Sequence, residues 1–350
     1  MEASFLYFVF WGEESLSLQI LVTGGAGYIG SHTCVALLEA GYGVVVADNL
    51  CNSRADVLER VEEITGHRVK FYRIDVTDEA AVDGVFKEQQ LDGVIHFAGL
   101  KAVGESVEKP LEYYYNNIVS TIVLAGKCRQ YGVERFVFSS SATVYGENSS
   151  PLVETMELKP RTNPYGETKA ISEQVLKDSA KVNRGWKVAL LRYFNPVGAH
   201  QSGLIGEEPS GVPNNLMPYI TQVAGGRLEK LKVFGDDYPT VDGTGVRDYI
   251  HVCDLAEGHV AALEKLEAGM HIYNLGTGRG TSVLELVKTF EEVNGLKIPY
   301  EIVERRPGDI AECYADPSKA ERELGWKARF TVADMCRDAW RYEQGKAKTD

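Results

Sequence analysis

From residue 18 onward, short apolar runs alternate with longer stretches whose apolar residues recur at helical spacing. The short runs are rich in β-branched residues, and several are apolar at nearly every position, as strands buried on both faces must be. Strands that alternate with helices in this way form parallel βαβ units. The pattern therefore predicts an α/β fold with a doubly wound parallel sheet of six or seven strands. The predicted strands cover residues 19–23, 43–48, 69–76, 93–97, 135–139 and 188–194.

After Asn195 the alternation gives way to loop-rich sequence, and segments 196–213 and 235–245 stand out for their glycine and proline. Long irregular segments inside a compact protein are usually functional loops. We therefore predict three regions along the chain. They are an N-terminal extension of unknown role (1–17), a nucleotide-binding domain (18–195), and a smaller substrate-binding lobe (196–350) in which residues from about 245 to 265 pack back on the first domain.

Composition excludes several classes of function. The 350 residues carry a net charge of −13, which repels polyanions, so we expect no nucleic-acid partner and phosphates held by local groups. Six cysteines without CxxC spacing indicate free thiols in a reducing compartment, and we expect the protein in the cytoplasm. Seven histidines in no ligand pattern predict no metal site.

The apolar run at residues 5–11 is the one candidate targeting segment in the sequence. It is too short to cross a bilayer. Its acidic flanks and the lack of a small-residue cleavage site argue against a signal peptide. We therefore expect no membrane association.

A glycine-rich string, GGAGYIG at residues 24–30, directly follows the first predicted strand and opens a helix. Glycines let the backbone turn tightly and approach a pyrophosphate, whose charge the helix N-terminus stabilises. Such a string alone is often a simple turn. Here Asp48 ends the second strand 18 residues after Gly30, where a carboxylate accepts hydrogen bonds from ribose hydroxyls. Together they predict a Rossmann-type dinucleotide site, and because Asp48 would repel a 2′-phosphate, NAD is predicted rather than NADP.

Tyr165 and Lys169 form a second motif, on a helix predicted to begin after Pro164. Residues four apart share a helical face, so the phenol and the ammonium point into one cleft. A Tyr-x-x-x-Lys pair alone also arises by chance on protein surfaces. Upstream, residues 139–141 are three serines at the carboxyl end of a predicted strand, where ligands of such sheets bind.

This set of residues predicts the oxidation of an alcohol. The unperturbed pKa of tyrosine is about 10, and the ammonium of Lys169 together with an oxidised nicotinamide would lower it. Tyr165 would then act as general base on a substrate hydroxyl while Ser141 orients the oxygen and hydride passes to NAD.

These motifs, in this order, resemble those of the extended short-chain dehydrogenase/reductase family. Further strings are similar to members of that family that act on nucleotide sugars, and the resemblance covers residues 18–342, nearly the whole chain. The strings are GGAGYIGSHT (24–33), HFAGLKAVGES (96–106), SSSATVYG (139–146), LRYFNPVGA (191–199), PNNLMPYI (213–220) and DYPTVDGTGVRDYIHV (237–252).

The resemblance implies a reversible, NAD-dependent 4-epimerisation of UDP-galactose and UDP-glucose through a 4-keto intermediate. It also implies a homodimer in which the helices around 103–131 and 165–181 pair with their mates. The implied catalytic residues are Tyr165, Lys169 and Ser141. The residues implied to hold NAD are Gly24, Gly27, Tyr28, Ile29, Gly30, Asp48, Asn49, Asn52, Ser53, Asp75, Val76, Phe97, Ala98, Gly99, Lys101, Asn116, Ser139, Tyr165, Lys169 and Tyr193. The residues implied to surround the UDP-hexose are Ser141, Tyr165, Asn195, Asn215, Leu216, Lys232, Phe234, Arg247, Tyr249, Arg306, Asp309 and Cys313.

Two alternatives compete with this interpretation. A nucleotide-sugar 4,6-dehydratase shares the oxidation but needs an extra acid/base pair, and the chain has Ala142 and Thr143 at those positions. A non-catalytic NAD-binding sensor could use the same fold, although the presence of Tyr165, Lys169 and Ser141 together argues against it.

The sequence departs from the family pattern at two places. Residues 1–17 have no counterpart. Cys313 occupies a sugar-facing position where many bacterial relatives carry a tyrosine. Within the family a small residue there accompanies activity on N-acetylated sugars, so the resemblance implies UDP-GalNAc and UDP-GlcNAc as a second substrate pair.

Overall fold

The computed structural model describes residues 18–209, 211, 213–306 and 309–346. The predicted N-terminal extension, with its apolar run, lies outside the described residues. Within the described ranges, no helix is both long and apolar enough to cross a membrane. All six cysteines lie in the described part of the chain and are free thiols.

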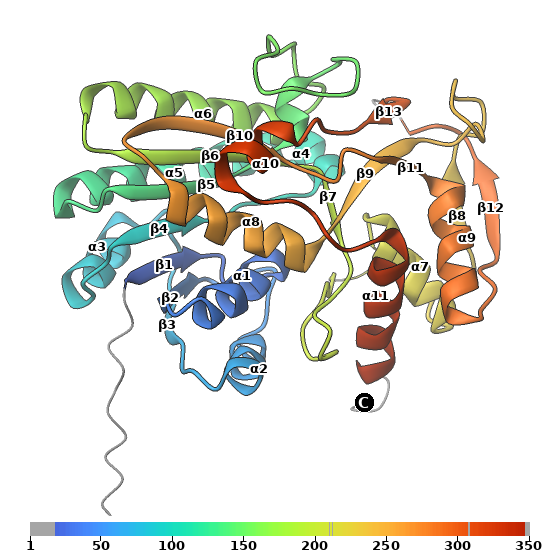
Figure 1. Ribbon diagram of the computed structural model, residues 1–350, viewed down its shortest axis with the longest axis horizontal. Coiled ribbons are helices and arrows are strands. Elements are labelled where there is room, and N and C mark those ends of the chain that lie inside the picture. The colour runs from blue at the N-terminus through green and yellow to red at the C-terminus, as the bar shows by residue number, and fades with distance from the viewer. Residues whose placement is uncertain (1–17, 210, 212, 307–308, 347–350) are drawn as a thin grey trace, which may run out of the picture.

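Seven parallel strands form the central sheet. They are β1 (Gln19–Thr23), β2 (Gly43–Asp48), β3 (Lys70–Arg73), β4 (Gly93–His96), β5 (Arg135–Ser141), β6 (Lys187–Tyr193) and β10 (Gly269–Leu275). Their order across the sheet is β10-β6-β5-β4-β1-β2-β3 (Figure 1). The predicted α/β fold with a doubly wound parallel sheet is confirmed. The order reverses between β1 and β4, and ligands of such sheets bind beyond the carboxyl ends of the strands at this point.

The third strand ends sooner than the sequence predicts. It covers Lys70–Arg73 rather than 69–76. Asp75 turns the chain here, because its Oδ1 accepts hydrogen bonds from the backbone N and the hydroxyl of Thr77, at 2.9 and 2.7 Å. The sequence-based prediction ran on because Ile74 and Val76 continue the alternation of apolar and polar residues.

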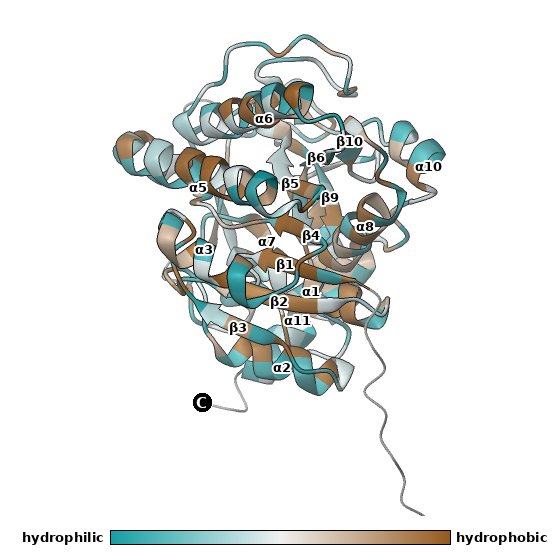
Figure 2. Ribbon diagram, turned by 90° about the vertical axis from the view of Figure 1, so that its left-hand side faces the viewer, coloured by the Kyte–Doolittle hydropathy of each residue, from teal (hydrophilic) through white to brown (hydrophobic). Residues whose placement is uncertain are grey.

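Helices cover both faces of the sheet. One layer contains α1 (Tyr28–Glu39), α2 (Asp56–Thr65) and α8 (Val252–Lys265); the other contains α3 (Glu79–Glu88), α5 (Pro110–Tyr131) and α6 (Pro164–Val182). Each layer packs its apolar side chains against one face of the strands. Figure 2 shows the hydrophobic strands β1 and β2 in the interior between these helices. The short helices α4 (Val103–Glu108) and η1 (Ala142–Tyr145) precede α5 and follow β5, respectively.

Much of the chain after residue 195 forms a smaller lobe with its own core. Its strands are β7 (Asn195–Val197), β8 (Leu231–Phe234), β9 (Val246–His251), β11 (Gly280–Ser282), β12 (Tyr300–Val303) and β13 (Glu312–Cys313), and its helices are α7 (Leu216–Ala224), α9 (Val283–Asn294) and α11 (Val332–Lys346). β9 pairs with β7, β11 and β13, while β8 pairs with β12. This lobe faces the carboxyl ends of the central strands (Figure 1).

The chain after residue 195 also returns to the first domain. α8 follows β9 directly and packs against α1, β10 pairs with β6, and α10 (Ser318–Leu324) packs against β10 and α8. The seventh strand of the sheet therefore lies outside the range 18–195 that the sequence predicts for the nucleotide-binding domain. Local hydrophobic pattern does not reveal which sheet a strand joins, so the pairing of β10 with β6 is visible only in the tertiary structure.

Candidate active site

The glycine loop connects β1 to α1 and requires glycine for steric reasons. Gly24 has a φ of +72°, and a Cβ there would lie 2.7 Å from the backbone N of Ala98. A Cβ on Gly30 would lie 2.2 Å from the carbonyl oxygen of Gly24. Gly27 is the N-cap residue of α1, and no side chain caps this helix. The first-turn amides, including those of Tyr28 and Ile29, are therefore suited to an anionic phosphate.

Asp48, at the carboxyl end of β2, organises the loop next to it. Its Oδ2 accepts a hydrogen bond from the N of Ala26 at 3.1 Å, and its Oδ1 accepts from the N of Leu50 at 2.8 Å and from the hydroxyl of Ser53 at 3.0 Å. The side chain is nearly buried. A buried carboxylate beside the glycine loop would repel a second negative charge, so this position fits a ribose without a 2′-phosphate.

The other residues implied to surround the adenosine part divide into two groups. Asn49 donates from Nδ2 to Oδ2 of Asp75 at 3.1 Å, and Asn52 is exposed beside Ser53. Val76 is buried in the core under α3, so only its backbone is available for contact with a ligand. The structure therefore places Asn49, Asp75 and Asn52 at one edge and keeps the Val76 side chain away from it.

The segment after β4 lies across the switch point from the glycine loop. The backbone N atoms of Phe97 and Ala98 both donate to the carbonyl of Thr23, and the Phe97 ring packs 4.7 Å from the ring of His259 on α8. Gly99 lies close to the side chain of Asn117, where a Cβ would approach its Oδ1 to 3.2 Å. Phe97 is thus partly a core residue, as its apolar character allows.

Asn117 is a buried residue of this region that the sequence analysis missed. Its Oδ1 accepts from the N of Leu100 at 2.8 Å, and its Nδ2 donates to the O of Leu100 and to the hydroxyl of Thr168, both at 3.0 Å. The implied cofactor residue Asn116 donates to the same Oδ1 at 3.0 Å. Asn117 thus ties the loop after β4 to helix α6.

Tyr165 and Lys169 lie on the first turns of α6. Pro164 occupies the first turn, and Asn163 caps the helix by accepting the N–H of Gly166 on its Oδ1 at 2.9 Å. Both functional side chains are directed toward the end of β5: Lys169 donates from Nζ to the carbonyl of Ser139 at 2.6 Å, and its Nζ lies 5.9 Å from the centroid of the Tyr165 ring. The predicted motif therefore does place phenol and ammonium together.

Burial dominates the electrostatics that the protein's own groups give this pair. Burial raises the pKa of Tyr165, and a hydrogen bond with Ser141 opposes that effect in part. Burial lowers the pKa of Lys169 to about 8. The groups of the protein alone thus raise the pKa of the phenol, because desolvation outweighs the hydrogen bond with Ser141.

The three serines that end β5 divide between two roles. The hydroxyls of Ser139 and Tyr193 hydrogen-bond to each other, and this joins β5 to β6. Ser141 Oγ accepts from the N of Thr143 at 3.2 Å and from its hydroxyl at 3.0 Å, so the hydroxyl hydrogen of Ser141 is available to Tyr165. Ser140 points to the opposite side, toward α6.

A cluster of charged and aromatic side chains from the smaller lobe faces this edge. Arg306 donates from Nε to Asp309 Oδ2 at 2.9 Å, its guanidinium lies 4.8 Å from the Phe234 ring, and Arg247 lies 4.0 Å from Asp309 Oδ1. Burial raises the pKa of the Tyr249 phenol to about 12, and the charges of Arg247 and Arg306 oppose the rise. The structure therefore brings together five of the residues implied to bind the nucleotide.

The remaining implied substrate residues lie around this cluster. On β8, Lys232 is exposed and shares its face with Phe234 because Leu231 and Val233 point to the core. Cys313 on β13 lies in register with Arg247, and burial raises the pKa of its thiol to about 11. Asn195 is exposed on β7.

Glu207 connects the two sets of implied residues, and the sequence analysis did not single it out. It accepts from Nδ2 of Asn215 at 2.7 Å, directly before α7 begins at Leu216, and lies 3.4 Å from Nζ of Lys101. Lys101 is implied to touch the cofactor and Asn215 the substrate. The only sequence signal was a carboxylate inside the glycine- and proline-rich segment 196–213.

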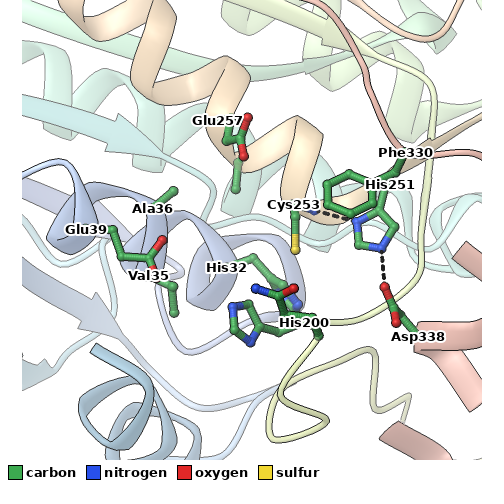
Figure 3. Close-up of a pocket in the computed structure, with 12 residues that line it drawn as sticks. His32, Val35, Ala36, Glu39, His200, His251, Cys253, Glu257, Phe330 and Asp338 are labelled. Carbon is green, nitrogen blue, oxygen red and sulfur yellow. Dashed lines mark hydrogen bonds and ion pairs between the residues drawn. The ribbon is translucent and has the colours of Figure 1, made fainter. Parts of the chain in front are cut away.

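A cavity of about 110 Å³ lies between α1 and α8 and is lined by His32, His200, His251 and Asp338 among others (Figure 3). None of the residues implied by the resemblance lines it. His251 accepts from the N of Cys253 at 3.1 Å, and its Nε2 lies 3.3 Å from Asp338 (Figure 3). Among the described residues, no group of three or more His, Cys, Asp or Glu is arranged to hold a metal ion.

Comparisons with known proteins agree with this geometry. A family model described as GDP-mannose 4,6 dehydratase matches residues 21–339. The UDP-glucose 4-epimerase of Bacillus subtilis (strain 168) is 61% identical over 329 residues, which cover 93% of this chain and 97% of that protein. The UDP-glucose 4-epimerase of Drosophila melanogaster is 56% identical over 335 residues, which cover 93% and 96%.

Two solved structures are similar over nearly the whole chain. A UDP-glucose 4-epimerase from Stenotrophomonas maltophila, with bound NAD and formylated UDP-arabinopyranose, is 52% identical with a TM-score of 0.93 and covers 95% of this chain and 100% of that one. One from Bifidobacterium longum, in complex with NAD+ and UDP, is 54% identical with a TM-score of 0.92 and the same coverage. Fold and site together define an α/β protein of the extended short-chain dehydrogenase/reductase class. Within that class, the chain belongs to the UDP-glucose 4-epimerase family.

Proposed function

We propose that this protein interconverts UDP-galactose and UDP-glucose by reversible inversion at C4, with NAD as a tightly held cofactor. The observation that carries the proposal is the pairing of Tyr165 with Lys169 at the carboxyl edge of the sheet, opposite a lobe that presents Arg247 and Arg306 around Asp309. The first pair suits a sugar hydroxyl and the second suits a diphosphate.

The residues around the glycine loop fit NAD. The uncapped N-terminus of α1 offers backbone amides to a pyrophosphate, and Asp48 offers a carboxylate to a ribose diol. NAD bound here would supply a hydride acceptor for the sugar C4 and a positive charge that favours the phenolate of Tyr165. Asn116 and Lys101, next to the loop after β4, are proposed to contact the cofactor beyond its first ribose.

Tyr165 acts in this proposal as the general base that takes the proton of the 4-hydroxyl group. Ser141 donates to the phenol oxygen and orients the sugar oxygen beside it. Lys169 is held by the carbonyl of Ser139, so its ammonium stays near the phenol throughout the cycle. The same tyrosine returns the proton after the 4-keto sugar has turned its other face.

The nucleotide half of the substrate is proposed to bind between the arginines. Guanidinium groups match the geometry of phosphate oxygens, and Arg247 and Arg306 can both reach one diphosphate because both lie within 4.0 Å of the Asp309 carboxylate. Phe234 offers an aromatic face beside them. A tight grip on UDP leaves the hexose free to rotate, as inversion requires.

Incubation of the purified protein with UDP-galactose tests this proposal directly. Formation of UDP-glucose supports it. A 4-keto-6-deoxy sugar product would instead indicate a 4,6-dehydratase, although Ala142 carries no acid or base and Thr143 is engaged with Ser141. Absence of any conversion by protein that still carries NAD would leave the sensor interpretation. Extraction of NADP rather than NAD would contradict the role given to Asp48.

Cys313 is proposed to admit N-acetylated sugars. Its side chain packs on the cluster around Tyr145 and Phe194, so a larger residue would project into the space beside Arg247. Overpacking costs roughly 1 to 3 kcal/mol, and each ~1.4 kcal/mol is a factor of ten. We expect wild type to interconvert UDP-GalNAc and UDP-GlcNAc, and Cys313→Tyr to lose that activity about tenfold or more while it keeps UDP-galactose turnover.

Steady-state rates on both sugar pairs, with Cys313→Ala as the control variant, measure the effect. Cys313→Ala should keep both activities because it adds no bulk. No turnover of UDP-GalNAc by wild type, or undiminished turnover by Cys313→Tyr, would show that Cys313 is not the gate.

A homodimer is proposed in which α4, α5 and α6 pair with their mates. These helices expose large apolar side chains, among them Val107 at 62%, Leu111 at 79% and Tyr115 at 63%. Adjacent exposed apolar residues on two helices are typical of a contact surface. We expect Leu111→Glu to convert a dimer into a monomer.

Light scattering coupled to size exclusion measures the oligomeric state. Val241→Glu is the control, because Val241 is 90% exposed on a loop of the smaller lobe and the variant should remain dimeric. A monomeric wild type would contradict the proposed homodimer. A dimeric Leu111→Glu variant would mean that the contact lies elsewhere on the surface.

A further inference from the structure

A cluster of charged and polar side chains is buried between the sheet and α6, on the far side of β5 from the candidate cofactor site. Glu173 on α6 and Arg192 on β6 are at its centre, and Ser140 on β5 completes it. Glu173 and Ser140 are 0% exposed and Arg192 is 1% exposed. The resemblance implies no role for these three residues, and the proposed reaction does not use them.

The carboxylate of Glu173 is fully occupied. Arg192 donates from Nε to Oε1 at 2.8 Å and from Nη2 to Oε2 at 2.6 Å, which is the two-pronged geometry of a guanidinium on a carboxylate. Ser140 donates to Oε1 at 2.6 Å and Lys177 donates to Oε2 at 3.0 Å. Burial by itself would raise the pKa of Glu173, but Arg192, Lys177 and Ser140 together outweigh it and the pKa lies below its usual value.

Every member of this cluster is a close chain neighbour of a residue in the candidate active site. Glu173 follows Lys169 by one helical turn and is the third member of a face that begins with Tyr165. Ser140 lies between Ser139, which holds Lys169, and Ser141, which bonds Tyr165. The cluster therefore joins the same segments as the site, from the opposite side.

The second contact of Arg192 extends this link. Arg192 directly precedes Tyr193, the partner of Ser139. Its guanidinium also lies 4.8 Å from the ring of Tyr145, in the short helix that begins directly after Ser141. Tyr145 in turn donates to Asn274 on β10 at 2.7 Å. Three strands, α6 and the turn after Ser141 are thus held at one point.

Stability alone does not explain a buried ion pair at this position. Well-packed apolar residues of similar size are often as stable or more stable, because two desolvated charges gain little over their hydration. A two-pronged ion pair adds a fixed orientation of the helix. An apolar contact lets a helix slide or rotate by a fraction of an ångström, whereas two parallel hydrogen bonds from one guanidinium do not. A misplacement of about 1 Å can lower a rate about 100-fold.

We propose that Glu173 and Arg192 are positioning residues, which fix the rotation and height of α6 over β5 so that Tyr165 and Lys169 meet Ser141 and the sugar hydroxyl. The role rests on the proposed epimerase function. It assigns the pair an effect on the rate of chemistry and none on nucleotide binding, because Arg247 and Arg306 lie on the other lobe.

The decisive variant is Glu173→Leu with Arg192→Met, which removes both charges and keeps an apolar filling. We expect it to retain bound NAD, a wild-type thermal midpoint or a higher one, and a KM for UDP-galactose within about twofold of wild type. Its kcat should fall by about 10- to 100-fold. Arg192→Lys, which keeps the charge and loses the fork, should show the same split between kcat and KM.

Lys127→Met is the matched control. Lys127 is a buried cation that binds Asp83 at 3.0 Å on α3 and α5, and no residue of the candidate site touches this pair. Its loss should lower the thermal midpoint and leave kcat unchanged. If the double variant does not fold, a variant that combines Ser140→Ala with Arg192→Lys is measured in its place.

The outcomes separate cleanly. A wild-type kcat in the folded Glu173→Leu, Arg192→Met variant overturns the positioning role. So does a wild-type kcat in the variant that combines Arg192→Lys with Ser140→Ala. The role is also overturned if kcat and thermal midpoint fall together in every variant and kcat recovers at low temperature. That result would mean that the pair contributes only to stability. Failure of wild type itself to convert UDP-galactose would instead contradict the proposed function.

Discussion

Replacement of Tyr165 by phenylalanine is expected to lower the turnover of UDP-galactose by about 100- to 10,000-fold, the range typical for loss of a general base. Phenylalanine keeps the ring that packs beside Lys169 and removes only the oxygen that bonds Ser141. We therefore expect NAD content and thermal midpoint to stay near those of wild type. Turnover and extracted cofactor, measured on the same preparation, check both parts.

Tyr131→Phe is the control for this variant. The Tyr131 hydroxyl donates to Asp83 at 2.9 Å, at the end of α5 remote from the sheet edge. Its removal should leave turnover unchanged. Near-normal turnover by Tyr165→Phe would mean that another group takes the proton, and equal losses in both variants would mean a general effect on the fold.

Substitution of Gly30 by alanine should prevent cofactor binding and so lower the activity by at least about 100-fold. The new Cβ would lie 2.2 Å from the carbonyl oxygen of Gly24, which is backbone and can move only if the whole glycine loop moves. Since the loop and the first turn of α1 are the proposed pyrophosphate site, displacement acts directly on NAD. The absorbance of cofactor released on denaturation measures the loss.

Gly84→Ala serves as the matched change. Gly84 lies within α3, and nothing stands within 4 Å of a Cβ built there. Alanine in a helix is about 0.5–1 kcal/mol more favourable than glycine, so this variant should keep its NAD and its activity. A Gly30→Ala protein that purifies with a full complement of NAD would contradict the packing argument.

The parts of the molecule that sequence predicted well are those whose signal is local. Buried strands such as β1 and β2 are apolar at nearly every position, and the glycine loop needs small residues at fixed spacing because of contacts within a few residues. The Tyr165–Lys169 pair is likewise set by one helical turn. These features follow from backbone geometry that a single segment determines.

The parts that sequence missed depend on pairs far apart in the chain. Glu173 stands among the polar residues of an amphipathic helix and reads as a solvated side chain until Arg192 is placed beneath it. Asn117 and Glu207 are similar cases, since each gains its meaning from partners supplied by another element. The burial that raises the pKa of the Tyr165 phenol is likewise a property of the assembled site, and no single segment reveals it.

The pairing of β10 with β6 has a consequence for how this protein folds during synthesis on the ribosome. A nascent chain that has released residues up to 195 has every segment implied to hold NAD, yet its β6 still presents an open edge, because the strand that covers it ends at Leu275. Open strand edges invite pairing with other chains. The central sheet thus cannot be completed before residues up to Leu275 have been synthesised, so a single cut after residue 195 would not yield two exchangeable modules.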